Sequence, residues 1–186
     1  MLKKILLVVA ALLAVLAVVV ALQPADFSIT RSATIAASDS VVFAQINDFH
    51  KWQAWSPWAK LDPAMTQTYS GASAGAGATY AWKGNKDVGE GKMTILESTP
   101  NSVVRINLEF IAPFAATNIA EFSLTPMVGG TTVAWTMTGR NNFMAKGANL
   151  VMNMDKLVGG DFEKGLTQLR TVSEAAVATP VQPSAP

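Results

Sequence analysis

The chain begins with a run of hydrophobic residues that no polar side chain interrupts. Ile5 to Leu22 are 18 consecutive Ile, Leu, Val and Ala residues. As a helix rising about 1.5 Å per residue, this run would be roughly 27 Å long, which is close to the thickness of a bilayer's hydrocarbon core. The pattern therefore predicts an N-terminal transmembrane anchor over residues 1–22. A short linker over residues 23–26 should follow, because Pro24 ends the helix.

The charges on either side of this run indicate its orientation. Lys3 and Lys4 precede it, and no Lys or Arg follows until Arg31. By the positive-inside rule the N-terminus stays in the cytoplasm, so we expect a single-pass protein of the cytoplasmic membrane with a periplasmic domain. A cleaved signal peptide is one alternative, although its apolar core is usually ~7–15 residues with a better cleavage site than Val19-Val20-Ala21. A buried core helix is another, but it would need a larger protein to cover it.

The next part of the chain predicts a strand and two short helices. Residues 27–36 alternate in polarity and are rich in Ile and Thr, which is typical of a strand. Ser38 is placed to cap a helix over residues 39–46, whose apolar positions have helical spacing. A second short helix should span residues 50–55 and end before Pro57.

Beyond Pro57 the apolar positions recur with a period of two. In one such run charged and polar residues occupy one face of the strand. The apolar residues share the other face: Val104, Ile106, Leu108 and Phe110. Turn residues separate these runs at hairpin spacing, as at Gly84-Asn85, Thr99-Pro100-Asn101 and Gly129-Gly130. Such one-sided alternation predicts an antiparallel sheet with one buried face.

A long final helix is expected from about Lys146 to Val177. Its apolar residues have 3.6-residue spacing and would cover the buried face of the sheet: Met154, Val158, Phe162, Leu169 and Val172. Three glycines weaken the helix, and they indicate either close packing against the sheet or space left in a hollow interior: Gly159, Gly160 and Gly165. The predicted fold class is α+β, with a folded domain over residues 27–177 and a Pro-rich disordered tail over residues 178–186.

Several local motifs occur in a specific order along this domain. They are Arg31-Ser-Ala-Thr-Ile-Ala, Trp52-Gln-Ala-Trp55-Ser-Pro-Trp58, Gly77-Ala-Thr-Tyr80-Ala-Trp82, Gly89-Glu-Gly-Lys-Met93 and Phe162-Glu-Lys-Gly-Leu166-Thr-Gln-Leu169. From Phe27 to Glu174 the chain resembles the START-like superfamily, also called SRPBCC, and within it the polyketide cyclase/dehydrase-like branch of unassigned function. This resemblance implies a helix-grip fold, in which a curved antiparallel sheet wraps around a long C-terminal helix. In this fold, a hydrophobic cavity lies between the sheet and the helix. It implies no single chemistry, because relatives include lipid carriers, hormone receptors, cyclases and binding proteins.

Composition excludes several classes of function. The 14 basic and 13 acidic residues give a net charge of +1, so no nucleic-acid partner is expected. The chain has no cysteine and one histidine, His50, which excludes thiolate chemistry and any site with two imidazoles. The sequence has no phosphate-binding glycine loop with lysine, no nucleophile elbow and no His-rich or acidic metal-binding group, so we expect no metal and no cofactor. Residues two positions apart on a helix point to different sides, so the side chain of Asp48 should face away from that of His50.

The candidate ligand-binding residues are mostly aromatic and sulfur-containing. Trp52, Trp55 and Trp58 recur every three residues, either as core residues or as the lip of a cavity or a membrane contact. Soft apolar side chains on shared strand faces and the last helix would line a cavity or form an ordinary core: Tyr80, Trp82, Met93, Trp135, Met137 and Met154. Arg140, at a strand end, is a candidate partner for a ligand carboxylate or phosphate.

These observations favour a membrane-tethered binding module that holds a hydrophobic small molecule or lipid between the sheet and the C-terminal helix. One alternative is a cyclase- or dehydrase-like enzyme, for which only His50, Tyr80, Glu90 and Arg140 are available as acid–base or polar groups. The other is a structural or partner-binding envelope protein without a small ligand. The volume of the cavity, and the polar side chains that reach it, would separate these hypotheses.

Overall fold

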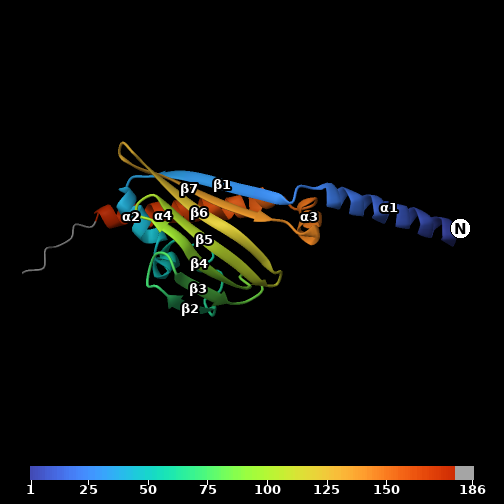
Figure 1. The fold of residues 1–186 in the computed structure, drawn as a ribbon, viewed down its shortest axis with the longest axis horizontal. Helices are drawn as coiled ribbons and strands as arrows, with labels where there is room; N and C mark the ends of the chain where they lie inside the picture. Colours follow the sequence, from blue (N-terminus) through green and yellow to red (C-terminus); the bar gives the residue numbers. More distant parts are fainter. Residues whose placement is uncertain (179–186) are drawn as a thin grey trace, which may run out of the picture.

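The computed structural model describes residues 1–178, in which one antiparallel sheet packs on a long helix while an apolar helix projects from the domain (Figure 1). The elements are α1 (Leu2–Leu22), β1 (Asp26–Ile35), α2 (Asp39–Ile46), the 3₁₀ helix η1 (Phe49–Ala54), β2 (Thr66–Gly71), β3 (Ala78–Lys83), β4 (Glu90–Thr99), β5 (Val103–Ala112), β6 (Ala116–Met127), β7 (Gly130–Arg140), α3 (Phe143–Asn149) and α4 (Met154–Ala178). Apart from Ala178, the tail that we expected to be disordered lies outside the described residues.

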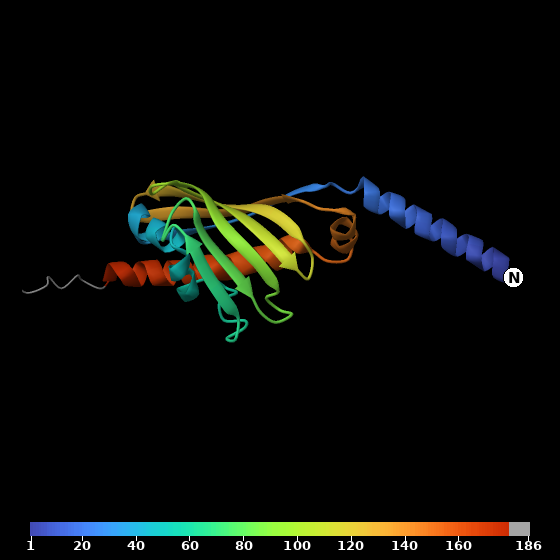
Figure 2. The same cartoon turned by 60° about the horizontal axis from the view of Figure 1, so that its bottom comes forward.

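The seven strands form one sheet in the order β1-β7-β6-β5-β4-β3-β2, and every neighbouring pair is antiparallel. Alternate residues of β6 and β7 are buried, as the period of two predicts. The sheet curves around α4, which lies along its concave face together with α2 and η1 (Figure 2). The predicted α+β fold, a curved sheet gripping a C-terminal helix, is confirmed.

Two glycines of α4 allow close packing against the sheet. A Cβ atom at Gly165 would lie 2.7 Å from the ring of Trp135 and 3.1 Å from Pro57. A Cβ atom at Gly159 would overlap the guanidinium of Arg31, whereas Gly160 has no such neighbour within 4 Å. Close packing, rather than a hollow interior, therefore accounts for Gly159 and Gly165.

The long final helix is in fact two helices, so the prediction of one helix from about Lys146 to Val177 is wrong. The chain leaves the helical path between Asn149 and Met154. Asn142 accepts a hydrogen bond from the Ala145 amide at 2.9 Å, and Asn153 accepts one from the Lys156 amide at 2.9 Å. Each asparagine thus caps a new helix start, a local preference that apolar spacing alone does not reveal.

α1 contacts the domain only near its C-terminal end. Val20 is the one buried residue of α1, and the rest of the helix is not covered by the domain. The alternative of a buried core helix is therefore wrong. Among the described residues, α1 alone is long and apolar enough to cross a membrane. A signal sequence at the N-terminus has the same length and composition, so these two criteria alone do not separate an anchor from a signal.

Arg31 joins β1 to the N-terminal half of α4. Its Nη2 lies 2.9 Å from Asp155 Oδ2, and its Nε donates to Glu163 Oε1 at 2.8 Å. Hydrogen bonding to the guanidinium lowers the pKa of the Asp155 carboxyl below its usual 3.8. The pair therefore stabilises the fold fully above the pKa of aspartate in the unfolded chain, and this contribution is lost as pH falls through the lower folded value.

We expect Arg31→Met to lower the free energy of unfolding at neutral pH and to have a smaller effect in acid. The acid measurement should be made at a pH well below the usual carboxylate pKa of about 4, so that Asp155 is becoming protonated. Urea unfolding at the two pH values checks this. Arg105→Met is the control, because the ion pairs of Arg105 are longer, at 3.8 and 3.6 Å, and half-exposed. An equal loss for Arg31→Met at both pH values would mean that packing of the side chain, not its charge, stabilises the contact.

Candidate ligand-binding cavity

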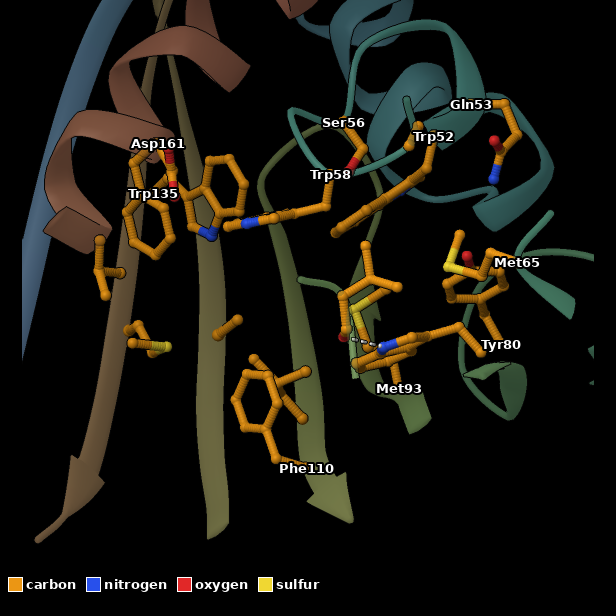
Figure 3. A pocket seen from close by; sticks show the side chains of 18 of the residues that line it. Trp52, Gln53, Ser56, Trp58, Met65, Tyr80, Met93, Phe110, Trp135 and Asp161 are labelled. Atoms are coloured by element: carbon orange, nitrogen blue, oxygen red, sulfur yellow. Dashed lines mark hydrogen bonds between the residues drawn. The ribbon is translucent and has the colours of Figure 1, made fainter. Parts of the chain in front are cut away.

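A cavity of about 260 Å³ lies between the concave face of the sheet, the segment around η1, and α4 (Figure 3). This volume is just below the ~300 Å³ at which ordinary small-molecule pockets begin. The residues that line it are Trp52, Gln53, Ser56, Trp58, Ala59, Met65, Tyr80, Trp82, Asp87, Val88, Met93, Leu108, Phe110, Ala120, Trp135, Met137, Val158, Asp161 and Phe162. Aromatic, methionine and aliphatic side chains dominate the lining, so the cavity suits an apolar molecule.

Strand alternation brings the sheet residues of the lining together. Tyr80 and Trp82 project from β3 on the same face, and Tyr80 stands directly opposite Met93 of β4. Trp82 lies over Gly91, where a Cβ atom would overlap its ring, and its Nε1 donates to the Val88 carbonyl at 3.0 Å. The missing side chain at Gly91 therefore lets the indole lie against the sheet as part of the cavity wall.

On the opposite side of the cavity Trp135 is the central residue of an aromatic cluster. Its ring stacks on Phe162 of α4, with centroids 4.1 Å apart and an interplanar angle of 6°, and meets Trp58 edge to face at 5.8 Å. The Trp135 Nε1 is buried and has no hydrogen-bond partner among residues 1–178. Because this atom has almost no accessible surface, a ligand oxygen could pair with it only if the neighbouring side chains moved.

Polar groups are few in this cavity. Burial raises the pKa of the Tyr80 phenol to about 12, so the phenol stays protonated at neutral pH. Gln53, Ser56, Asp87 and Asp161 also reach the lining. Asp161 forms an ion pair with Lys164, one turn further along α4, at 2.9 Å.

The structure separates the predicted site residues into three groups. Six of them line this cavity: Trp58, Tyr80, Trp82, Met93, Trp135 and Met137. Trp55 does not, because its fully buried ring packs beneath Trp52, Phe122 and Trp135 and its Nε1 donates to the Gln45 carbonyl at 3.2 Å. Arg140 and Met154 instead line a second hollow.

The second hollow has a volume of about 760 Å³ and lies between the ends of β1 and β7 and the connection from α3 to α4. Arg140 is mostly exposed at its rim, with its Nε 3.9 Å from Asp26 Oδ1. Three residues, Phe110, Met137 and Val158, line both the hollow and the cavity. The two spaces are therefore neighbours that share an apolar wall.

Sequence reasoning missed several lining residues and one pairing. Met65, Ala120 and Asp161 line the cavity, but no pattern singled them out because small, flexible or charged residues carry no periodic signal. The expectation that Asp48 faces away from His50 is wrong: Asp48 caps η1, and its Oδ1 lies 2.9 Å from His50 Nδ1. This pair lies outside the cavity lining, and the His50 ring stacks on Tyr69 with centroids 4.2 Å apart.

The described residues contain no group of three or more His, Asp or Glu side chains that could hold a metal ion. Among the residues considered for catalysis, only Tyr80 lines the cavity, because His50 and Glu90 lie elsewhere and Arg140 lies at the second hollow. The mostly apolar lining is suited to holding an apolar molecule, and its ionisable side chains are Tyr80, Asp87 and Asp161.

A family model described as "Polyketide cyclase / dehydrase and lipid transport" matches residues 26–174. The chain belongs to this family. Membership confirms the resemblance expected from the sequence, and it accords with a ligand-binding cavity between sheet and helix. No curated protein matches the chain in sequence.

Solved structures share the fold of this family member at low sequence identity. Protein CV1439 from Chromobacterium violaceum is 15% identical with a TM-score of 0.58, over 79% of this chain and 96% of that one. The di-domain ARO/CYC protein StfQ from the steffimycin biosynthetic pathway is 7% identical with a TM-score of 0.60, over 83% of this chain and 53% of StfQ. The Aha1 protein from Colwellia psychrerythraea is 14% identical with a TM-score of 0.52, over 80% of this chain and 95% of that one. At these identities the likeness is one of fold alone.

Proposed function

We propose that this protein is a membrane-tethered binding module that holds an apolar small molecule or a lipid in the cavity between sheet and α4. The observation that carries the proposal is the cavity itself, about 260 Å³ with a lining of aromatic and methionine side chains. The protonated Tyr80 phenol, which lines the cavity, supplies a donor for a single polar end of the ligand. The enzymatic alternative has less support, since His50, Glu90 and Arg140 do not share the cavity with Tyr80.

The tether in this proposal is α1. Lys3 and Lys4 precede its apolar run and no basic residue follows before Arg31, which favours a cytoplasmic N-terminus and a periplasmic domain. In this proposal the binding domain covers residues 27–177, and the linker of residues 23–26 includes Asp26, which is also the first residue of β1. The exposed surface of α1 supports a membrane segment over a core helix, because its apolar side chains have no protein covering them.

Uptake of an apolar probe tests the binding function. A fragment from residue 23 onward keeps the domain's core, because Val20 is the only residue of α1 that is buried. We expect this fragment to bind N-phenylnaphthylamine saturably, with one probe per chain, and to retain a cell-derived apolar molecule that solvent extraction and mass spectrometry detect. Full-length protein in nanodiscs should bind the probe equally. The absence of saturable uptake in both forms, with no co-purified molecule, would overturn the binding proposal.

A further inference from the structure

The segment from Asn142 to Asn153, called the foot below, comprises α3 and its connection to α4. It exposes more apolar surface than a water-facing segment of this length normally does: Phe143 is 53% exposed, Met144 75%, Leu150 42%, Val151 86% and Met152 47%. The foot contains no acidic residue, and Lys146 is its single charged side chain. This composition is typical of a segment at a membrane interface rather than of one in water.

The foot lies beside the end of α1. Both ribbon views place α3 next to the C-terminal turn of α1 (Figures 1 and 2). Lys146 Nζ donates to the Ala21 carbonyl at 3.2 Å, and the side chain of Val20 lies 3.9 Å from the Cβ position of Gly147. The foot is therefore level with the last turn of the apolar helix, which is where a spanning α1 would leave the hydrocarbon.

The short connection between α1 and the sheet keeps the start of β1 close to the bilayer. Only Gln23, Pro24 and Ala25 separate α1 from β1, and three residues reach at most about 10 Å when extended. The Lys146 ammonium, hydrogen-bonded to the Ala21 carbonyl, would place the single positive charge of the foot at the end of α1, near the lipid phosphates.

The second hollow lies beside both the foot and the cavity. Leu150, Val151 and Met152 of the foot line one end of it, and Phe110 and Met137 line both the hollow and the cavity. An apolar chain in the hollow would therefore contact side chains that also line the cavity.

We propose that the foot inserts into the surface of the phospholipid leaflet next to the domain, and that the second hollow is the entrance through which a lipid chain reaches the cavity. The proposal rests on the proposed membrane tether and binding function. It adds a membrane-contact surface, a route and a class of ligand, a phospholipid taken directly from the bilayer. Arg140, which is mostly exposed, and the neighbouring Asn141 also line this hollow and would face the headgroup region.

Depth-sensitive labelling tests the insertion of the foot. Because the chain has no cysteine, Met144→Cys or Val151→Cys places a single environment-sensitive fluorophore on the full-length protein. The matched control is Val128→Cys, since Val128 is 99% exposed in the turn between β6 and β7, at the end of the sheet far from α1 (Figure 1). In proteoliposomes of phosphatidylcholine and phosphatidylglycerol, we expect the foot labels to shift to the blue and to be quenched by nitroxide-labelled lipids, unlike the control. If the foot labels show the emission of a water-exposed fluorophore and no quenching by the nitroxide-labelled lipids, the proposal is overturned. This holds whether α1 has been cleaved or the foot lies outside the bilayer.

Transfer of a fluorescent phospholipid from these liposomes tests the entrance. We expect Val151→Asp to slow transfer into the protein about tenfold while final occupancy stays unchanged, and Val128→Asp to transfer at the wild-type rate. Uptake of N-phenylnaphthylamine from solution separates the two proposals. If Val151→Asp takes up N-phenylnaphthylamine normally and receives the phospholipid at the wild-type rate, the proposed entrance is overturned and the binding function is not. Failure of the wild-type protein to take up either molecule would overturn the binding function, while the depth of the foot labels would still decide insertion.

Discussion

Replacing Trp55 with alanine is expected to lower the free energy of unfolding by about 3–5 kcal/mol, a large part of the ~5–15 kcal/mol that stabilises a typical domain. The Trp55 ring is fully buried and packs against three other aromatic rings, those of Trp52, Phe122 and Trp135, with centroids 4.6 to 6.0 Å away. Truncation would remove these contacts and leave the Gln45 carbonyl without the indole donor. The cost is therefore large although Trp55 does not line the cavity.

Trp58→Ala is the matched comparison for this prediction. Trp58 is half-buried and lines the cavity, so its replacement should cost less stability and should weaken probe binding more. Urea unfolding of the domain from residue 23 onward, followed by near-ultraviolet circular dichroism, measures the stability of both variants. If Trp58→Ala proved the more destabilising of the two, the packing described for the aromatic cluster would be wrong.

The fold was predictable because two strong patterns determine it. Period-two alternation in runs such as Val104 to Phe110 predicts which strand face is buried, and hairpin turns between the runs predict antiparallel neighbours. The order of elements and motifs then gave the helix-grip architecture by resemblance. The sequence prediction failed at the break between α3 and α4. The apolar spacing begins only at Met154, and capping asparagines start a separate helix on either side of the break.

The site was predictable only in part, because burial depends on the three-dimensional arrangement rather than on spacing. Trp52, Trp55 and Trp58 have equal spacing, yet Trp55 is in the core and Trp58 lines the cavity, since the chain turns away after η1 at Pro57. Arg140 was expected near a ligand, but at the end of β7 it reaches the second hollow instead. The contact of Lys146 with the end of α1 joins positions 125 residues apart, and no local pattern predicts such a contact.

Ala120→Phe is expected to reduce the affinity for an apolar probe at least tenfold while leaving the domain folded. Ala120 lies on the buried face of β6 and lines the cavity, so a phenyl ring at this position would occupy space that a ligand needs. A loss of about 1.4 kcal/mol in binding corresponds to a tenfold change in affinity, which is less than the value of burying one large apolar group. Overpacking of a filled core costs ~1–3 kcal/mol, but the cavity gives this side chain room, so the loss of stability should lie at or below the lower end of that range.

The control for this variant is Ala134→Phe on β7. Ala134 precedes Trp135, so its side chain points to the opposite face of the sheet, away from the cavity. We expect Ala134→Phe to bind N-phenylnaphthylamine with wild-type affinity in a fluorescence titration. Wild-type affinity in Ala120→Phe, with the fold intact by circular dichroism, would mean that the probe binds outside the cavity. In that case the second hollow, which Ala120 does not line, would become the site to block next.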